Sequence, residues 1–225
     1  MALAHSPSIT RTGLVQTVDA ANVKSYSGSG TTWTDLSSNL KDLTLTASPT
    51  YTSGSAGYFT FNGSSQYAIN SSFSSHQTSA GTLSLWAYPT TTSGDLYAIA
   101  VGGTATYGAS RAIRINNGFW CAVNYGSSTE DLNNIVAADA NTWVNIVYVW
   151  NGTTITYYKN AVSSSGTRSG MVTPTGTTLT VGATAWSPIY GFWPGRISNV
   201  SVYNVALTSN QVENNFQALR GRYGI

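Results

Sequence analysis

The sequence is poor in charge. Its 225 residues include ten Lys or Arg and eight Asp or Glu, and charged residues make up 8% of the chain, against about 25% in a typical soluble domain. Nucleic-acid-binding proteins need a strongly basic surface. A net charge of +2 without basic clusters therefore argues against this function. Eight carboxylates also leave few ligands for a metal cage or an acid–base pair. Hydrophobic residues at 41% are sufficient for a core, so the low charge does not indicate disorder.

Cysteine and long apolar runs are also scarce. The single cysteine, Cys121, excludes an intrachain disulfide, and we expect it to behave as a small buried apolar residue. No apolar stretch reaches the length of about 18 residues that a membrane span needs. The N-terminus lacks the basic start and apolar run of a signal peptide. We therefore expect a soluble protein that is made in a cytoplasm.

Short runs of β-forming residues separated by turns dominate the chain. The runs are rich in Val, Ile, Thr and aromatic residues, which pleated strands favour. Asn117-Gly118 and Asn151-Gly152 each separate two such runs and predict tight hairpins, because these dipeptides tolerate positive φ. Consecutive hairpins predict an all-β fold, a two-sheet antiparallel β-sandwich. The expected strands are 14–19, 43–46, 58–61, 66–69, 82–88, 96–101, 112–116, 119–124, 143–150, 153–159, 179–182 and 195–203.

Two segments carry further structural signals. The run 143–150 is largely apolar on both faces, so we expect it near the centre of a sheet. Thr208 and Gln211 are spaced as a helix capping box, and the residues at 212, 216 and 219 form one apolar stripe. The chain is thus expected to divide into an extended arm (1–12), the sandwich (13–207), and a C-terminal helix and tail (208–225).

Several segments of the sequence carry a shared family pattern. The most characteristic is Leu83-Ser-Leu-Trp-Ala-Tyr-Pro89. The others are 13–22, 26–37, 58–63 with Tyr67 shortly after, 143–147, 195–208 and the C-terminal helix. Together they resemble laminin-G-like, concanavalin-A-like lectin/glucanase domains, and the segment 83–89 is similar to the "S-x-W-x-x-P" strand of that family. The resemblance covers residues 13 to 219 and implies a two-sheet jelly roll.

The two ends of the chain resemble a more particular group. The Met-Ala start, the Gly13-Leu-Val strand and the ending Asn215-Phe-Gln-Ala-Leu-Arg-Gly-Arg-Tyr-Gly-Ile225 are similar to free-standing versions found in structural proteins of marine and cyanobacterial bacteriophages. This resemblance implies a protein of the virion surface, as a capsid decoration or a tail or fibre component. Such a protein is made in the host cytoplasm and needs no export signal. The alternative localisation is extracellular.

Catalysis is not expected. Glycosidases of this fold resemble one another in a Glu-x-Asp-x-x-Glu strand, and glycoside hydrolysis normally needs two placed carboxylates. The only glutamates are Glu130 and Glu213. Glu130 and Asp131 are adjacent, so an extended backbone points them to opposite faces. Neither His5 nor His76 accompanies a nucleophile elbow.

Metal ligands are also sparse. Members of the family often bind Ca²⁺, which prefers six to eight oxygen ligands. The segment 64–67 has no carboxylate, and Asn199 stands at a position that is often acidic in the family. Asp19 and Asp35 match family positions and are weak candidates. We expect them instead to fix turns by hydrogen bonds to the backbone, and we expect no cofactor.

Aromatic side chains in loops are the candidates for glycan binding, because sugars stack on exposed ring faces. The first group lies in the loop 185–194 and comprises Trp186, Tyr190, Phe192 and Trp193. The second group comprises Trp120, Asn124 and Tyr125, leading into the expected loop 126–134. The alternative interpretation is that these rings pack across the top of the sandwich or against another subunit.

Two functional hypotheses follow. The first is a non-enzymatic virion structural or accessory protein that displays a lectin-like sandwich and forms a homo-oligomer. The second is a dedicated carbohydrate-binding adhesin whose partner is a polysaccharide. Neither involves nucleic acid or membrane insertion. The residues expected to contact partner proteins are His5, Ile9, Arg11, Arg220, Arg222 and Tyr223.

Overall fold

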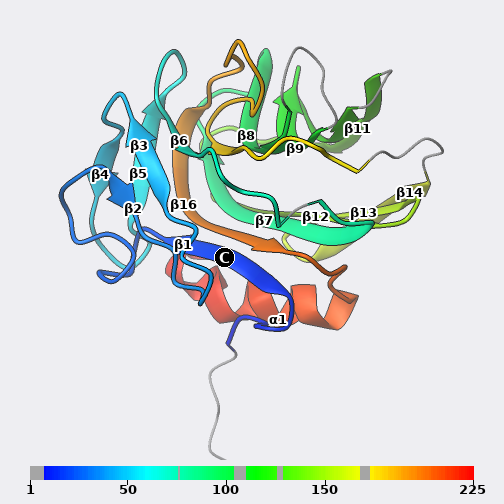
Figure 1. Ribbon diagram of the computed structural model, residues 1–225, viewed down its shortest axis with the longest axis horizontal. Helices are drawn as coiled ribbons and strands as arrows, with labels where there is room; N and C mark the ends of the chain where they lie inside the picture. Colours follow the sequence, from blue (N-terminus) through cyan, green and yellow to red (C-terminus); the bar gives the residue numbers. More distant parts are fainter. Residues whose placement is uncertain (1–7, 76, 104–109, 126–128, 168–172) are drawn as a thin grey trace, which may run out of the picture.

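The computed structural model describes residues 8–75, 77–103, 110–125, 129–167 and 173–225, without the side chains of 125, 129–134 and 167. In this part of the chain, two antiparallel β-sheets lie face to face, and one α-helix covers the outer face of one sheet (Figure 1). This arrangement confirms the predicted two-sheet sandwich. We call the sheet beside the helix sheet A and the other sheet B.

Sheet A has the order β14-β13-β12-β7-β16-β5-β4, and β1 also pairs with β16. Its longest strands, β7 and β16, lie at its centre and pair with each other. The strands are β1 (Leu14–Asp19), β4 (Thr50–Thr52), β5 (Tyr58–Asn62), β7 (Ala80–Pro89), β12 (Val144–Asn151), β13 (Thr154–Lys159), β14 (Val162–Thr167) and β16 (Pro194–Tyr203).

Sheet B has the order β11-β10-β9-β8-β15-β6-β3-β2. Asn117 (φ 45°) and Gly118 (φ 93°) form the turn between β9 and β10, as their positive-φ tolerance predicts. The strands are β2 (Thr32–Trp33), β3 (Leu43–Thr46), β6 (Tyr67–Asn70), β8 (Asp95–Gly102), β9 (Ser110–Asn116), β10 (Phe119–Tyr125), β11 (Thr129–Ala137) and β15 (Leu179–Val181).

The central strand β12 is buried on both faces, as predicted. Ile146, Tyr148 and Trp150 point into the core between the sheets. Val147 and Val149 point to the opposite side, where they pack in the cluster that includes Val212 of the helix. Side chains of successive residues alternate between the two faces of a strand, so this apolar run separates two buried layers.

Helix α1 (Ser209–Leu219) begins at the predicted capping box. The Thr208 hydroxyl accepts from the Gln211 amide, and the Gln211 side chain accepts from the Thr208 N–H. The apolar stripe of Val212, Phe216 and Leu219 is buried against sheet A. Among the described residues, no helix is long and apolar enough to cross a bilayer.

The C-terminal segment folds back onto the protein itself. After the 3₁₀ turn η1 (Arg220–Arg222), the ring of Tyr223 stacks on Trp86 with 4.0 Å between centroids. Its hydroxyl donates to Ser198 Oγ at 2.9 Å, and only 7% of Tyr223 is exposed. The expectation that Tyr223 projects toward a partner protein is therefore wrong, because the ring completes the layer beneath sheet A.

The first described residues also lie on this layer. Ile9 packs against the cluster of Trp86, Phe216 and Tyr223. The Thr10 N–H donates to Asn215 Oδ1 at 2.7 Å. Residues 8–10 are thus held against α1, while His5 falls outside the described residues.

The buried tyrosines predict a loss of stability at high pH. Burial raises the pKa of Tyr148 and that of Tyr203 from 10.0 to about 12. Between pH 10 and 12 the unfolded chain therefore releases these protons while the folded chain retains them. Below pH 10 this contribution is fully present. As the pH rises toward 12, the free energy of unfolding should fall by about 1.4 kcal/mol per pH unit for each such tyrosine.

Urea denaturation of the wild type and of Tyr203→Phe between pH 8 and 11 measures this contribution. The variant should show a shallower decline above pH 10. Identical slopes for the two proteins would contradict the assignment to Tyr203.

Candidate functional site

The aromatic loop between β15 and β16, residues 182–193, lies across the outer face of sheet B. Tyr97 on β8 donates its N–H to the Gly191 carbonyl at 2.8 Å. Within the loop, the Thr184 N–H donates to the Tyr190 carbonyl, and the Tyr190 N–H donates to Thr184 Oγ1, both at 3.0 Å. These bonds hold the loop to the sheet surface, where it is seen at the top of Figure 1.

Trp186 secures the middle of this loop. Its ring meets that of Tyr97 edge to face, with 5.3 Å between centroids, and it packs with Ala100 and Ala112 of sheet B. Only 2% of Trp186 is exposed. The prediction of an exposed stacking face on Trp186 is therefore wrong, because the ring covers apolar side chains that sheet B would otherwise present to water.

The other two tryptophans among the candidates lie inside the sandwich. Trp120 and Trp193 stack at 5.7 Å between centroids, and both are 0% exposed. Asn124 is also 0% exposed, since the alternation of β10 turns residues 120, 122 and 124 inward. These three side chains offer no surface to a sugar, so the prediction is wrong for Trp193 of the first expected group and for Trp120 and Asn124 of the second. The side chain of Tyr125 lies outside the described part.

A cleft of about 380 Å³ opens beside the loop. The hydroxyl-bearing residues Thr177, Thr178 and Ser187 line it together with the apolar side chains of Ile69, Ala185, Trp186 and Ile189. No ionisable side chain is among the described residues that line it. Such a surface can hydrogen-bond hydroxyl groups and cover apolar faces without requiring a charge.

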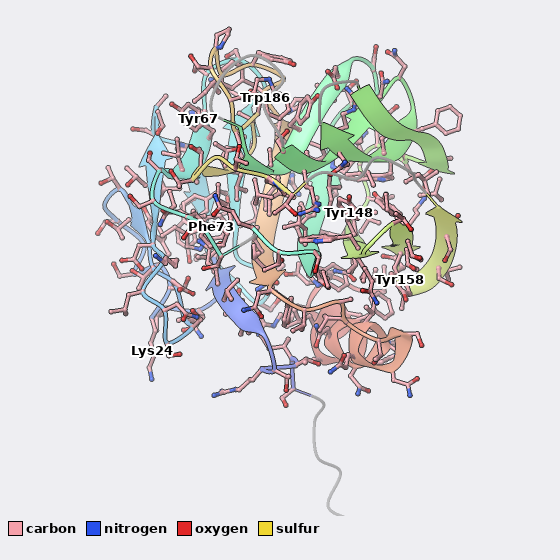
Figure 2. The ribbon with its side chains drawn as sticks, turned by 45° about the vertical axis from the view of Figure 1, so that its right-hand side comes forward. Lys24, Tyr67, Phe73, Tyr148, Tyr158 and Trp186 are labelled. Carbon is pink, nitrogen blue, oxygen red and sulfur yellow. The ribbon has the colours of Figure 1, made fainter. Side chains whose placement is uncertain are left out.

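Two half-buried rings continue this surface. Tyr67 and Ile69 are two residues apart on β6 and so project from the same outer face. Tyr67 lies 6.2 Å, centroid to centroid, from Phe192 of the loop. Figure 2 shows Tyr67 and Trp186 at the same end of the molecule. Tyr190 is also half-buried, against Tyr97 and Trp186.

Tyr67 is not among the binding residues predicted from the sequence, although strand alternation provides a signal for it. In Tyr67-Ala-Ile-Asn70 the alanine is fully buried, so strand alternation places its neighbours outward. The folding of the distant loop 182–193 onto sheet B makes Ile69 part of the cleft wall and brings Phe192 against Tyr67. We define the cleft site as Tyr67, Thr177, Thr178, Ser187 and Phe192.

Asp35 and Asp19, the two candidate calcium ligands, accept hydrogen bonds from other groups of the chain. Asp35 accepts the N–H groups of Thr17, Ser37 and Lys41, each at 2.9 Å, and the Ser37 hydroxyl at 2.6 Å. Asp19 accepts from the Ala21 N–H at 3.0 Å and from Arg222 at 2.6 Å. This confirms the interpretation that both residues fix turns.

No three His, Cys, Asp or Glu side chains come together to hold a metal ion in the part of the chain that the structure describes. Glu213 lies on α1 and accepts a hydrogen bond from Gln217. The side chains of Glu130 and Asp131, and residue His76, lie outside the described residues. Cys121 is buried, as predicted.

Asp35 yields a test of these structural roles. Asp35→Ala should lower the free energy of unfolding by about 2–4 kcal/mol, because it leaves three N–H groups without their acceptor. Added Ca²⁺ should restore none of this loss. The matched control is Asp139→Ala, since Asp139 pairs with Lys159 at a side-chain exposure of 65% and should cost less than about 1 kcal/mol. Equal losses in the two variants, measured by urea denaturation, would refute the assignment.

Comparison with solved structures supports the fold. Domain 4 of an extracellular arabinanase of glycoside hydrolase family 43 from Geobacillus stearothermophilus, solved with arabinotriose, matches with a TM-score of 0.70 and 17% identity, over 90% of this chain and 97% of that domain. The binding domain of botulinum neurotoxin DC, solved in complex with SialylT, matches with a TM-score of 0.69 and 12% identity, over 92% of this chain.

The chain spans only 52% of that neurotoxin domain. A type C botulinum neurotoxin structure, described as entering cells through interaction with two ganglioside molecules, has a TM-score of 0.67 and 11% identity, over 92% of this chain and 51% of the other. At these identities the likeness concerns the fold. No curated protein matches the sequence significantly. The model of the concanavalin A-like lectin/glucanases superfamily matches residues 61–213, well over half of the chain, and the protein therefore belongs to this superfamily.

Proposed function

We propose that this protein is a non-enzymatic saccharide-binding module whose site is the cleft between the loop 182–193 and the segment 177–178. The observation that carries the proposal is the chemistry of the cleft. Three hydroxyl-bearing residues line it together with the apolar side chains of Ile69, Ala185, Trp186 and Ile189. Tyr67, two residues from Ile69 on β6, lies against Phe192 of the loop. A sugar presents hydroxyl groups at its edges and C–H groups on its faces, and both kinds of partner are available here.

The absence of charge from the described lining favours a neutral saccharide. Ion pairs contribute little to the recognition of a ligand without charge, and burying an unpaired charge beneath it would be costly. The solved relatives that are described with arabinotriose or with gangliosides support a saccharide ligand. Without a carboxylate at the cleft, the described residues provide binding rather than hydrolysis.

The two half-buried rings allow a direct test. The double variant Tyr67→Ala/Phe192→Ala should weaken binding of neutral oligosaccharides at least tenfold, since it removes apolar surface worth about 1.4 kcal/mol or more in the complex. Ligands would be found on an array of neutral oligosaccharides that includes arabinotriose, and affinities measured by isothermal titration calorimetry.

Phe119→Ala is the matched control, because Phe119 is an aromatic residue of sheet B that is 38% exposed and does not line the cleft. It should leave the affinity unchanged. Near-ultraviolet circular dichroism should show that the double variant keeps the Trp120–Trp193 core. No binding by the wild type at millimolar oligosaccharide, or equal weakening in the control, would refute the proposal.

We propose further that the module is displayed on a bacteriophage particle. The similarity of both chain ends to phage structural proteins supports this location, with other virion proteins as partners. Ile9 and Thr10 contact the α1 layer, so the test removes only residues 1–7 of the expected arm and keeps both contacts. Deletion of residues 1–7 should reduce incorporation into particles, scored by mass spectrometry of purified virions. Full incorporation of the deletion variant would refute a role for the arm.

A further inference from the structure

A second and larger cavity lies at the other end of the molecule. It has a volume of about 630 Å³ and forms where the N-terminal segment 8–11, strand β1, the turn after β1 and the end of α1 meet. Figure 2 shows Lys24, which lines it, at the opposite end from Trp186. We call this cavity the basic groove. Its volume lies within the range of small-molecule binding sites, about 300–1,000 Å³.

Positive charge is concentrated in the basic groove. Arg11, Lys24 and Arg222 line it, against the single carboxylate of Asp19. The groove thus carries two net positive charges, as many as the whole chain. Its charge contrasts with the cleft beside the loop 182–193, whose described lining contains no Lys, Arg, Asp or Glu.

Two of these cations differ from the others described in the structure. Arg11 and Lys24 are exposed and form no ion pair, side-chain hydrogen bond or ring contact with a described residue. Every other described cation has a partner for its charged end. The pairs are Lys41 with the Ser72 carbonyl, Arg111 with Trp150, Arg114 with Asp95, Lys159 with Asp139, Arg196 with Tyr58 and Tyr88, Arg220 with Gln217, and Arg222 with Asp19.

Arg222 can serve as a third contact. Its Nη1 donates to Asp19 Oδ2 at 2.6 Å, and a guanidinium group has five N–H donors. Since 36% of the Arg222 side chain is exposed, donors remain for a second anion. The Asp19 contact also fixes the orientation of the guanidinium group, which lowers the entropy lost when a ligand binds.

The remaining lining suits a saccharide better than a simple ion. Asn22 and Ser38 contribute amide and hydroxyl groups, and Leu14, Leu36 and Leu219 contribute apolar surface. Two net charges are too few for the phosphate backbone of a nucleic acid, whose binding uses many cations. They match two carboxylates spaced along a short sugar chain.

We propose that the basic groove is a second saccharide site, which binds a uronic-acid oligosaccharide through its carboxylates. Arg11, Lys24 and Arg222 pair with the carboxylates, while Asn22 and Ser38 hydrogen-bond the sugar hydroxyls. The groove shares no described lining residue with the cleft site, so this inference does not depend on the neutral-saccharide function.

Titration calorimetry with tetragalacturonate in 50 mM NaCl tests the proposal. The double variant Arg11→Gln/Lys24→Gln should bind at least tenfold more weakly than the wild type. The fully methyl-esterified tetramer, which keeps the sugar skeleton and loses the charge, should bind the wild type at least tenfold more weakly than the acid. The matched control is Lys41→Gln/Arg220→Gln, which removes the same charge outside the groove and should bind within twofold of the wild type.

Each contrary outcome overturns the inference. These outcomes are no binding of tetragalacturonate by the wild type at millimolar concentration, equal affinity for the ester, and equal weakening in the control variant. Neutral-saccharide binding is measured separately with Tyr67→Ala/Phe192→Ala. Arg11→Gln/Lys24→Gln should retain that binding in full, so failure of the basic groove is distinguishable from failure of the cleft site.

Discussion

The burial of Trp193 between the two sheets is the constraint on which the candidate site depends. Its ring stacks on Trp120 in the core. Its backbone N–H donates to the Gly182 carbonyl at 2.9 Å, which joins the two ends of the loop. Trp186 holds the middle of the same loop against the outer face of sheet B. The loop is therefore anchored twice, by Trp193 inside the sandwich and by Trp186 on its outer face. That position places Ser187 opposite Thr177 and Thr178 and forms the cleft.

The chain has few charged side chains, and most of those described form contacts that stabilise the fold. Arg196 lies over the rings of Tyr58 and Tyr88, at 4.8 and 4.4 Å from their centroids. The carboxylate of Asp35 organises the turn after β2 through backbone N–H groups. Because most described charges have such structural partners, the two that do not, Arg11 and Lys24, stand out at one groove. In a chain of average charge, the same two residues would not be conspicuous.

The sequence predicted the regular parts of the fold well and its edges poorly. Strands β1 and β3 have the predicted bounds, since their composition and flanking turns are typical of strands. By contrast, β2, β4, β11 and β14 were not predicted. Strand β14, Val162-Ser-Ser-Ser-Gly-Thr167, lacks strand-forming composition and is extended because it pairs with β13. Strand β11 likewise pairs with β10 and occupies most of the expected loop 126–134.

By itself, the sequence determined the all-β sandwich, the Asn117-Gly118 turn and the Thr208 helix cap, because these depend on alternation and on residues close together in the chain. Only the tertiary structure decided which aromatic rings are exposed. A loop with four aromatic residues has the same local pattern whether it projects into solvent or folds back, and burial depends on contacts with residues far away in sequence. The same holds for the basic groove, since Arg11, Lys24 and Arg222 meet only when both ends of the chain pack beside β1.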